Sequence, residues 1–299
     1  QLELLLDLDL DPQALAVEAV LIAQLVPGHG EVPLIRVLVG DEPERVARVL
    51  RHVAVEDVAH GEDGWERVVR LPPFLDPGPF RRAAGMRAEY RNAIAATYQL
   101  DPDVPWLVVA SMMQSRDQVA SYRMLAAALA RLGDLPWRLI VAGNGPARNE
   151  VESAINAALP GRACFLGELM LAELAAVYAA SDLYVWPAVN ETYGRDMYEA
   201  QAAGIAVVSC APRGVPDSVA EGRTGTRVPP GDAEALTQMV RTLVLNPSRR
   251  LAMGRAAAAF IDEERSLDAA AARLDRAVAR VVRDPELPPS AAKDRLPQS

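Results

Sequence analysis

Lysine, histidine and cysteine are scarce in this chain, and each scarcity excludes a class of site. The one lysine is Lys293, so any cation that binds a phosphate must be an arginine. The two cysteines, Cys164 and Cys210, fall in strand-like apolar segments, which predicts reduced core thiols and a cytoplasmic protein. The sequence contains no Cys/His spacing typical of zinc, no P-loop and no serine-nucleophile elbow.

Long apolar runs and excess positive charge are also missing. No apolar run reaches the roughly 20 residues needed to cross a bilayer, so we expect no transmembrane segment, which leaves peripheral membrane contact open. The net charge of −9 and the pI of about 5.0 argue against a nucleic-acid-binding surface. No signal peptide is visible, and the chain begins with Gln1 rather than methionine, so we expect a processed chain or a fragment.

The first 77 residues predict a small domain that alternates strands and helices. Residues 2–10 predict a strand, and Asp11 and Pro12 then open a helix that extends to Val26. A strand over 34–39, a helix over 43–53 and a weak strand over 54–60 complete a βαβαβ unit. The proline-dense segment 68–80 predicts a hinge between two domains.

Residues 78–284 predict a second and larger domain, followed by a disordered, proline-rich tail over 285–299. Strand-like runs and helical periods alternate here, which is typical of a parallel sheet covered on both faces. The predicted strands are 106–111, 137–142, 163–166, a strand starting at 182, 205–209 and 226–228. The fold class is therefore α/β, with two Rossmann-like doubly wound parallel sheets, the first of them reduced.

The strongest candidate site lies in the stretch 182–209. Two carboxylates, Glu191 and Glu199, stand eight positions apart, and Gly194 lies between them. If a helix begins near Gly194, Glu191 lies in the loop at the end of the strand, and Glu199 lies in the second helical turn. Free amides of the first turn suit a phosphate, and the carboxylates suit sugar hydroxyls.

Weaker candidates follow other predicted strands. Gly143 and Asn144 form either a tight strand-to-helix turn or a close backbone approach to a ligand. Arg116, in the loop after 106–111, is placed to face a diphosphate, whereas Arg123 lies on a helix and also fits a surface charge. His60 ends a weak strand and is either catalytic or structural.

The run Asn190 to Gly204 resembles the E-x7-E signature of retaining nucleotide-sugar glycosyltransferases of the GT-B fold, particularly family 4. The turn Gly143-Asn-Gly-Pro146 is similar to that family's G-D/N-G-P turn, and Phe165-Leu-Gly167 is similar to its F-x-G strand end. The resemblance is strong over about 104–275 and thin before residue 68.

This resemblance implies a role for each candidate residue. Glu199 would hold the ribose hydroxyls of the donor, and Glu191 would contact the donor sugar and stabilise positive charge at its anomeric carbon. Main-chain amides of Tyr193, Gly194 and Arg195 would meet the sugar and the diphosphate, and the segment Gly167, Glu168 and Leu169 would lie beside the base. The resemblance also implies that no metal is needed, because a helix N-terminus and basic side chains neutralise the leaving diphosphate.

The sequence departs from the family in two places. The loop after 106–111 usually carries an arginine and a lysine, but here Gln114 and Gln118 stand at the approximate cation positions, and Arg116 is the candidate substitute. The part before residue 77 is also short for an acceptor-binding domain.

The sequence therefore predicts transfer of a sugar from a nucleotide-diphosphate donor to an unidentified acceptor, with retention of configuration. The alternative is a non-catalytic relative that binds a nucleotide sugar or a partner protein. A nucleotide-sugar epimerase or a phosphorylase of the same fold ranks last.

Overall fold

The computed structural model describes residues 18–24, 34–40, 68–114, 116–189, 194–210 and 218–283. The chain divides into two compact units, one containing Gln1–Asp76 with Leu267–Ser299 and the other containing Pro77–Ser266. The predicted strand 2–10, helix 43–53, strand 54–60 and tail 285–299 lie outside the described residues.

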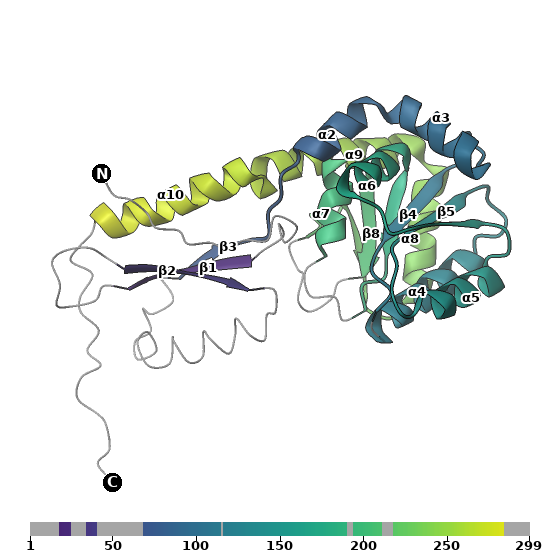
Figure 1. Cartoon of the computed structure of the whole chain (residues 1–299), viewed down its shortest axis with the longest axis horizontal. Coiled ribbons are helices and arrows are strands. Elements are labelled where there is room, and N and C mark those ends of the chain that lie inside the picture. Colours follow the sequence, from purple (N-terminus) through teal and green to yellow (C-terminus); the bar gives the residue numbers. More distant parts are fainter. Residues whose placement is uncertain are drawn as a thin grey trace, which may run out of the picture. The chain divides into compact units, whose positions relative to one another are not determined.

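The described part of the first unit is a three-stranded antiparallel sheet with one helix. Its strands are β1 (Glu18–Gln24), β2 (Leu34–Gly40) and β3 (Val68–Leu71), in the order β2-β1-β3. Helix α10 (Leu267–Arg283) packs against β3 and β1 (Figure 1).

Two expectations for this unit are corrected. The predicted helix up to Val26 is wrong at residues 18–24, which form β1, although β2 confirms the strand predicted at 34–39. Residues 19–23 are continuously apolar, and such a run fits a buried strand as well as a helix, so pairing with β2 decides between them. The described strands pair antiparallel, whereas we expected a parallel sheet.

The second unit contains the predicted parallel sheet, which has six strands in the order β6-β5-β4-β7-β8-β9. Continuous runs of β-branched and aromatic residues form its central strands because these strands are buried on both faces. The strands are β4 (Trp106–Ala110), β5 (Arg138–Ala142), β6 (Ala163–Gly167), β7 (Leu183–Trp186), β8 (Ala206–Cys210) and β9 (Gly225–Val228).

Helices cover both faces of this sheet. Figure 1 shows α4 and α5 on one face and α6 and α7 on the other, while α2 and α3 pack on the outside of α6. The helices of the unit are α2 (Gly78–Gly85), α3 (Arg87–Tyr98), α4 (Arg116–Ala130), α5 (Arg148–Ala158), α6 (Leu171–Ala180), α7 (Arg195–Ala202), α8 (Ala233–Leu245) and α9 (Pro247–Phe260), and a short π-helical turn, η2 (Ile261–Arg265), follows α9. The described residues 218–221, which precede β9, are not helical.

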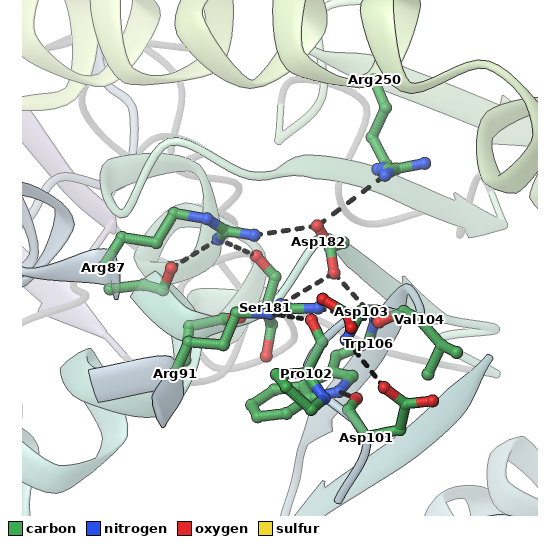
Figure 2. Close-up of polar contacts among 12 residues, drawn as sticks. Arg87, Arg91, Asp101, Pro102, Asp103, Val104, Trp106, Ser181, Asp182 and Arg250 are labelled. Carbon is green, nitrogen blue, oxygen red and sulfur yellow. Dashed lines mark hydrogen bonds and ion pairs between the residues drawn. The ribbon is translucent and has the colours of Figure 1, made fainter. Parts of the chain in front are cut away.

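A mostly buried carboxylate, with 11% of its side chain exposed, fastens α3 to the amino-terminal edge of the sheet (Figure 2). Asp182 accepts hydrogen bonds from Arg87 (2.8 Å), Arg91 (3.0 Å) and the Trp106 amide (2.8 Å), and Arg250 lies 3.7 Å away. Burial lowers the pKa of Arg87 and of Arg250, and the charge of Asp182 opposes this shift. Since Asp182 precedes β7 and lies at the edge opposite the candidate site, this cluster is structural.

Candidate functional site

The topology of the six-stranded sheet determines where a ligand fits. The chain runs outward from β4 to β5 and β6, then crosses back to β7 on the other side of β4. The loops after β4 and β7 therefore diverge at the carboxyl edge, and ligands of open α/β sheets bind in the crevice at such a switch point. Apart from Arg123, which lies in the middle of α4, the candidate residues that the structure describes lie in loops or in the first two turns of helices at this edge.

Gly143 and Gly145 hold the loops after β4 and β5 together. Gly143 has a φ of 130°, and a Cβ there would lie 2.0 Å from the Ser111 carbonyl oxygen. The Met113 amide donates to the Asn144 carbonyl over 3.0 Å, and a Cβ at Gly145 would lie 2.5 Å from the Met113 carbonyl oxygen. The close approach that these glycines allow is thus to the chain's own backbone.

We expect Gly143→Ala to lower the free energy of unfolding by about 3 kcal/mol or more, because the new Cβ meets backbone that cannot move independently. Gly161 is the matched control, since it also has a positive φ (70°) but has no atom within 4 Å of its Cβ position. Gly161→Ala should cost only about 1 kcal/mol, the strain of the left-handed backbone alone. Urea unfolding of both variants measures the difference, and equal losses would contradict the contact with Ser111.

Gly167 joins the same group of loops. Its carbonyl accepts a hydrogen bond of 2.7 Å from the Gly143 amide, so Gly167 lies against the turn formed by Gly143 and Asn144. Glu168 is exposed and Leu169 is half-buried directly after it. The first residue of α5, Arg148, reaches over Gly167, with one guanidinium nitrogen 3.4 Å from the position of a Gly167 Cβ.

The start of α7 forms the other side of the switch point. Gly194 is the N-cap, with φ 59° and ψ 41°, which confirms the predicted helix start and places Glu199 in the second turn. The preceding loop contains Ala188, which is buried and has a φ of 52°, an uncommon conformation for a residue other than glycine. The Val189 amide donates to the Ser121 hydroxyl over 2.9 Å and links this loop to α4.

Glu199 is the buried acid of this edge, with 6% of its surface exposed. Burial raises the pKa of the Glu199 carboxyl, and Arg195 opposes the shift through an ion pair of 2.9 Å between Arg195 Nε and Glu199 Oε1. The hydroxyl of Tyr178 lies close enough to act on Glu199 but has no partner within hydrogen-bond geometry. Burial, and then the charge of Glu199, raise the pKa of Tyr178.

The two arginine candidates of α4 lie in different environments. Arg116 is the first residue of the helix, is exposed and forms no ion pair with another described residue. Arg123 donates to Glu150 over 2.7 Å, with both side chains largely exposed, so it is a surface ion pair. Glu191, Tyr193 and His60 lie outside the described residues.

The sequence reasoning missed Arg148, Tyr178 and the side-chain role of Arg195. Arg148 follows the Gly145-Pro146 turn at a helix start, where a cation is unfavourable for the helix dipole. This unfavourable placement is visible in the sequence and could have marked Arg148 as a candidate. The spacing of four residues between Arg195 and Glu199 on a helix also predicts an ion pair. No sequence signal places Tyr178, on α6, beside Glu199.

Comparison with known proteins determines the family. The family model described as "Glycosyl transferases group 1" matches residues 105–246, the segment that carries the sheet and the site. These residues belong to the group 1 glycosyltransferases. The D-inositol 3-phosphate glycosyltransferase of Pseudarthrobacter chlorophenolicus is 30% identical over 210 residues, which cover 69% of this chain and 48% of that protein.

Two solved structures share this fold. A glycosyltransferase from Rickettsia africae superposes with a TM-score of 0.63 at 20% identity, over 79% of this chain and 62% of that one. Anabaena Alr3699/HepE, solved in complex with UDP, gives a TM-score of 0.57 at 18% identity, over 69% and 56% of the chains. The chain spans about half the length of the D-inositol 3-phosphate glycosyltransferase that it matches.

The described residues contain neither a membrane-spanning helix nor a cluster of metal ligands. Among them, no helix is both long and apolar enough to cross a membrane. In the same part of the chain, no three His, Cys, Asp or Glu side chains gather closely enough to hold a metal ion.

Proposed function

We propose that this chain carries the donor site of a retaining glycosyltransferase, which moves a sugar from a nucleotide-diphosphate donor to an acceptor. The observation that carries the proposal is the buried Glu199 in the second turn of α7, at the switch point of a group 1 glycosyltransferase sheet. A buried acid with a raised pKa costs folding free energy, so its position favours a binding role over a structural one.

In this proposal, Glu199 accepts hydrogen bonds from the two ribose hydroxyls, and the first-turn amides of α7 after Gly194 meet the diphosphate. The base lies beside Gly167, Glu168 and Leu169, with the Gly143 and Asn144 turn next to it. Glu191 stabilises positive charge at the anomeric carbon, and the Tyr193 amide contacts the sugar. Catalytic roles for Arg116 and His60 are proposed from the sequence pattern alone.

The nucleotide is proposed to be a uridine diphosphate, since the Anabaena neighbour was solved with UDP. The finer architecture is part of the same proposal: a Rossmann-like donor domain of the GT-B type over 78–284, a smaller amino-terminal domain over 1–77 and a tail over 285–299. A cytoplasmic site of action is supported by the two free thiols of Cys164 and Cys210.

Calorimetry with UDP and GDP, combined with an assay of donor hydrolysis or transfer, tests the proposal. We expect binding of one nucleotide, turnover of its sugar conjugate, and loss of both in Glu199→Ala. Absence of turnover with every common nucleotide sugar, together with unchanged nucleotide binding in Glu199→Ala, would overturn it.

One observation favours a second candidate, a non-catalytic relative that binds the nucleotide sugar. The described loop 111–114 contains no cation, and its exposed side chains are those of Met112, which is 57% exposed, and Gln114. A leaving diphosphate without a facing cation loses transition-state stabilisation. Nucleotide binding without turnover supports this candidate, and robust turnover excludes it.

A further inference from the structure

The ion pair between Arg195 and Glu199 joins the surface to the buried acid. Arg195 is the first residue of α7, and 40% of its side chain is exposed, against 8% for Glu199. The Nε atom of the arginine lies 2.9 Å from Oε1 of the carboxylate, one helical turn away. A partly exposed cation therefore reaches inward to a carboxylate that solvent barely contacts.

The stability of α7 does not explain this pair. The N-terminus of a helix carries partial positive charge, so an arginine at the first position is unfavourable there. At a spacing of four, an acid followed by a base is the favourable order, and α7 has the reverse. The pair therefore has a purpose other than helix stability.

The environment of Glu199 indicates that purpose. Burial favours the protonated acid, whereas the Arg195 guanidinium favours the carboxylate, and the Tyr178 hydroxyl of α6 lies nearby without a hydrogen-bond partner of its own. Asp196, the next residue of α7, acts on Tyr178. An ionised carboxylate accepts hydrogen bonds at both oxygens, whereas a protonated one must donate from one of them. Recognition of two ribose hydroxyls thus requires the ionised form.

We propose that Arg195 is a positioning residue, whose side chain holds the Glu199 carboxylate ionised and oriented as the acceptor for both hydroxyls of the donor ribose. This inference rests on the proposed function, and it adds a side-chain role to the main-chain contact that the sequence resemblance implied. Arg195 acts through Glu199, so its effect on binding depends on pH and disappears when Glu199 is replaced.

The test measures UDP affinity by calorimetry at pH 6 and pH 8 in the full chain. We expect Arg195→Met to weaken binding at pH 6 on the order of tenfold, and much less at pH 8, because without the guanidinium Glu199 takes up a proton at higher pH. Arg195→Lys retains the charge and should restore most of the affinity at pH 6. Arg123→Met is the matched control, because it removes a surface partner of Glu150 and should leave UDP affinity unchanged at both pH values.

A double-mutant cycle separates positioning from direct contact with the diphosphate. In a Glu199→Gln background, titrated with enough UDP to measure its weaker binding, we expect Arg195→Met to cause no further loss of UDP affinity. An equal loss of affinity at both pH values, or additive losses in the cycle, would overturn the positioning role and place Arg195 on the phosphates. If the wild type binds UDP and Arg195→Met binds equally well, this inference alone fails; if the wild type binds neither UDP nor GDP, the proposed function fails with it.

Discussion

Replacement of Glu199 by glutamine is expected to weaken UDP binding roughly a hundredfold. The change keeps the size of the side chain and removes its charge, so the two charge-assisted hydrogen bonds to ribose become weaker neutral ones. A loss of about 3 kcal/mol corresponds to that factor in Kd. Calorimetric titration of UDP into the wild type and into Glu199→Gln measures the change directly.

The same variant should retain its stability, and this outcome separates a binding role from a structural one. Because the pKa of Glu199 is raised in the folded state, ionisation of this group costs folding free energy. The cost is absent below the unfolded-state pKa, about 4.3 for glutamate, and grows as pH rises through the folded-state pKa. We expect the free energy of unfolding of Glu199→Gln, relative to the wild type, to rise over that interval.

Glu150→Gln is the matched control for this variant. Glu150 is also the acid of an arginine ion pair, with Arg123 at 2.7 Å, but about half of its side chain is exposed. UDP affinity should be unchanged in Glu150→Gln. A hundredfold loss in both variants, or loss of folding in Glu199→Gln, would contradict a specific binding role for Glu199.

Replacement of Asp182 by alanine is expected to lower the free energy of unfolding by about 3–5 kcal/mol. The variant leaves Arg87, Arg91 and Arg250 close together with no facing carboxylate, and the Trp106 amide loses its acceptor (Figure 2). Breaking a largely buried ion pair costs more than the pair itself contributes, since Arg91 and Arg250 stay mostly shielded from water and keep only main-chain carbonyls as partners. Urea unfolding followed by circular dichroism measures the loss.

Asp134→Ala provides the comparison for Asp182→Ala. Asp134 forms an ion pair with both terminal nitrogens of Arg241, yet most of its side chain is exposed. Exposed pairs contribute little to stability because water already solvates both charges. We expect a much smaller change than in Asp182→Ala, and a similar change in the two variants would contradict the buried-cluster account.

The strands of the second unit could be predicted closely because their apolar residues indicate burial on both faces of a sheet. The run 106–110 is apolar at every position, and in 206–210 only Ser209 is polar, which suits strands buried on both faces. The first unit could not be predicted in this way. Residues 19–23 are equally apolar, but such a short run fits a helix or a strand, and only pairing with β2 selects the strand. The apolar pattern of one segment does not report whether another segment pairs with it, even one that begins ten residues later, as β2 does after β1.

In the second unit, too, features marked by local sequence could be predicted, and features formed by residues distant in the sequence could not. Glu199 was placed in the second turn of its helix because Gly194 marks the helix start locally. The Asp182 cluster escaped prediction, since its arginines come from positions 87, 91 and 250 and meet only in the folded chain. The predicted roles of Glu191, Tyr193 and His60 remain predictions, because these residues lie outside the described part of the chain.

A crystal structure of the full chain with UDP tests the central claim most directly. The account predicts the ribose hydroxyls at hydrogen-bond distance, about 3 Å, from the Glu199 carboxylate, and the diphosphate at the first-turn amides of α7 after Gly194. UDP bound away from the carboxyl edge of the six-stranded sheet, or bound there with its ribose on other side chains, would contradict it.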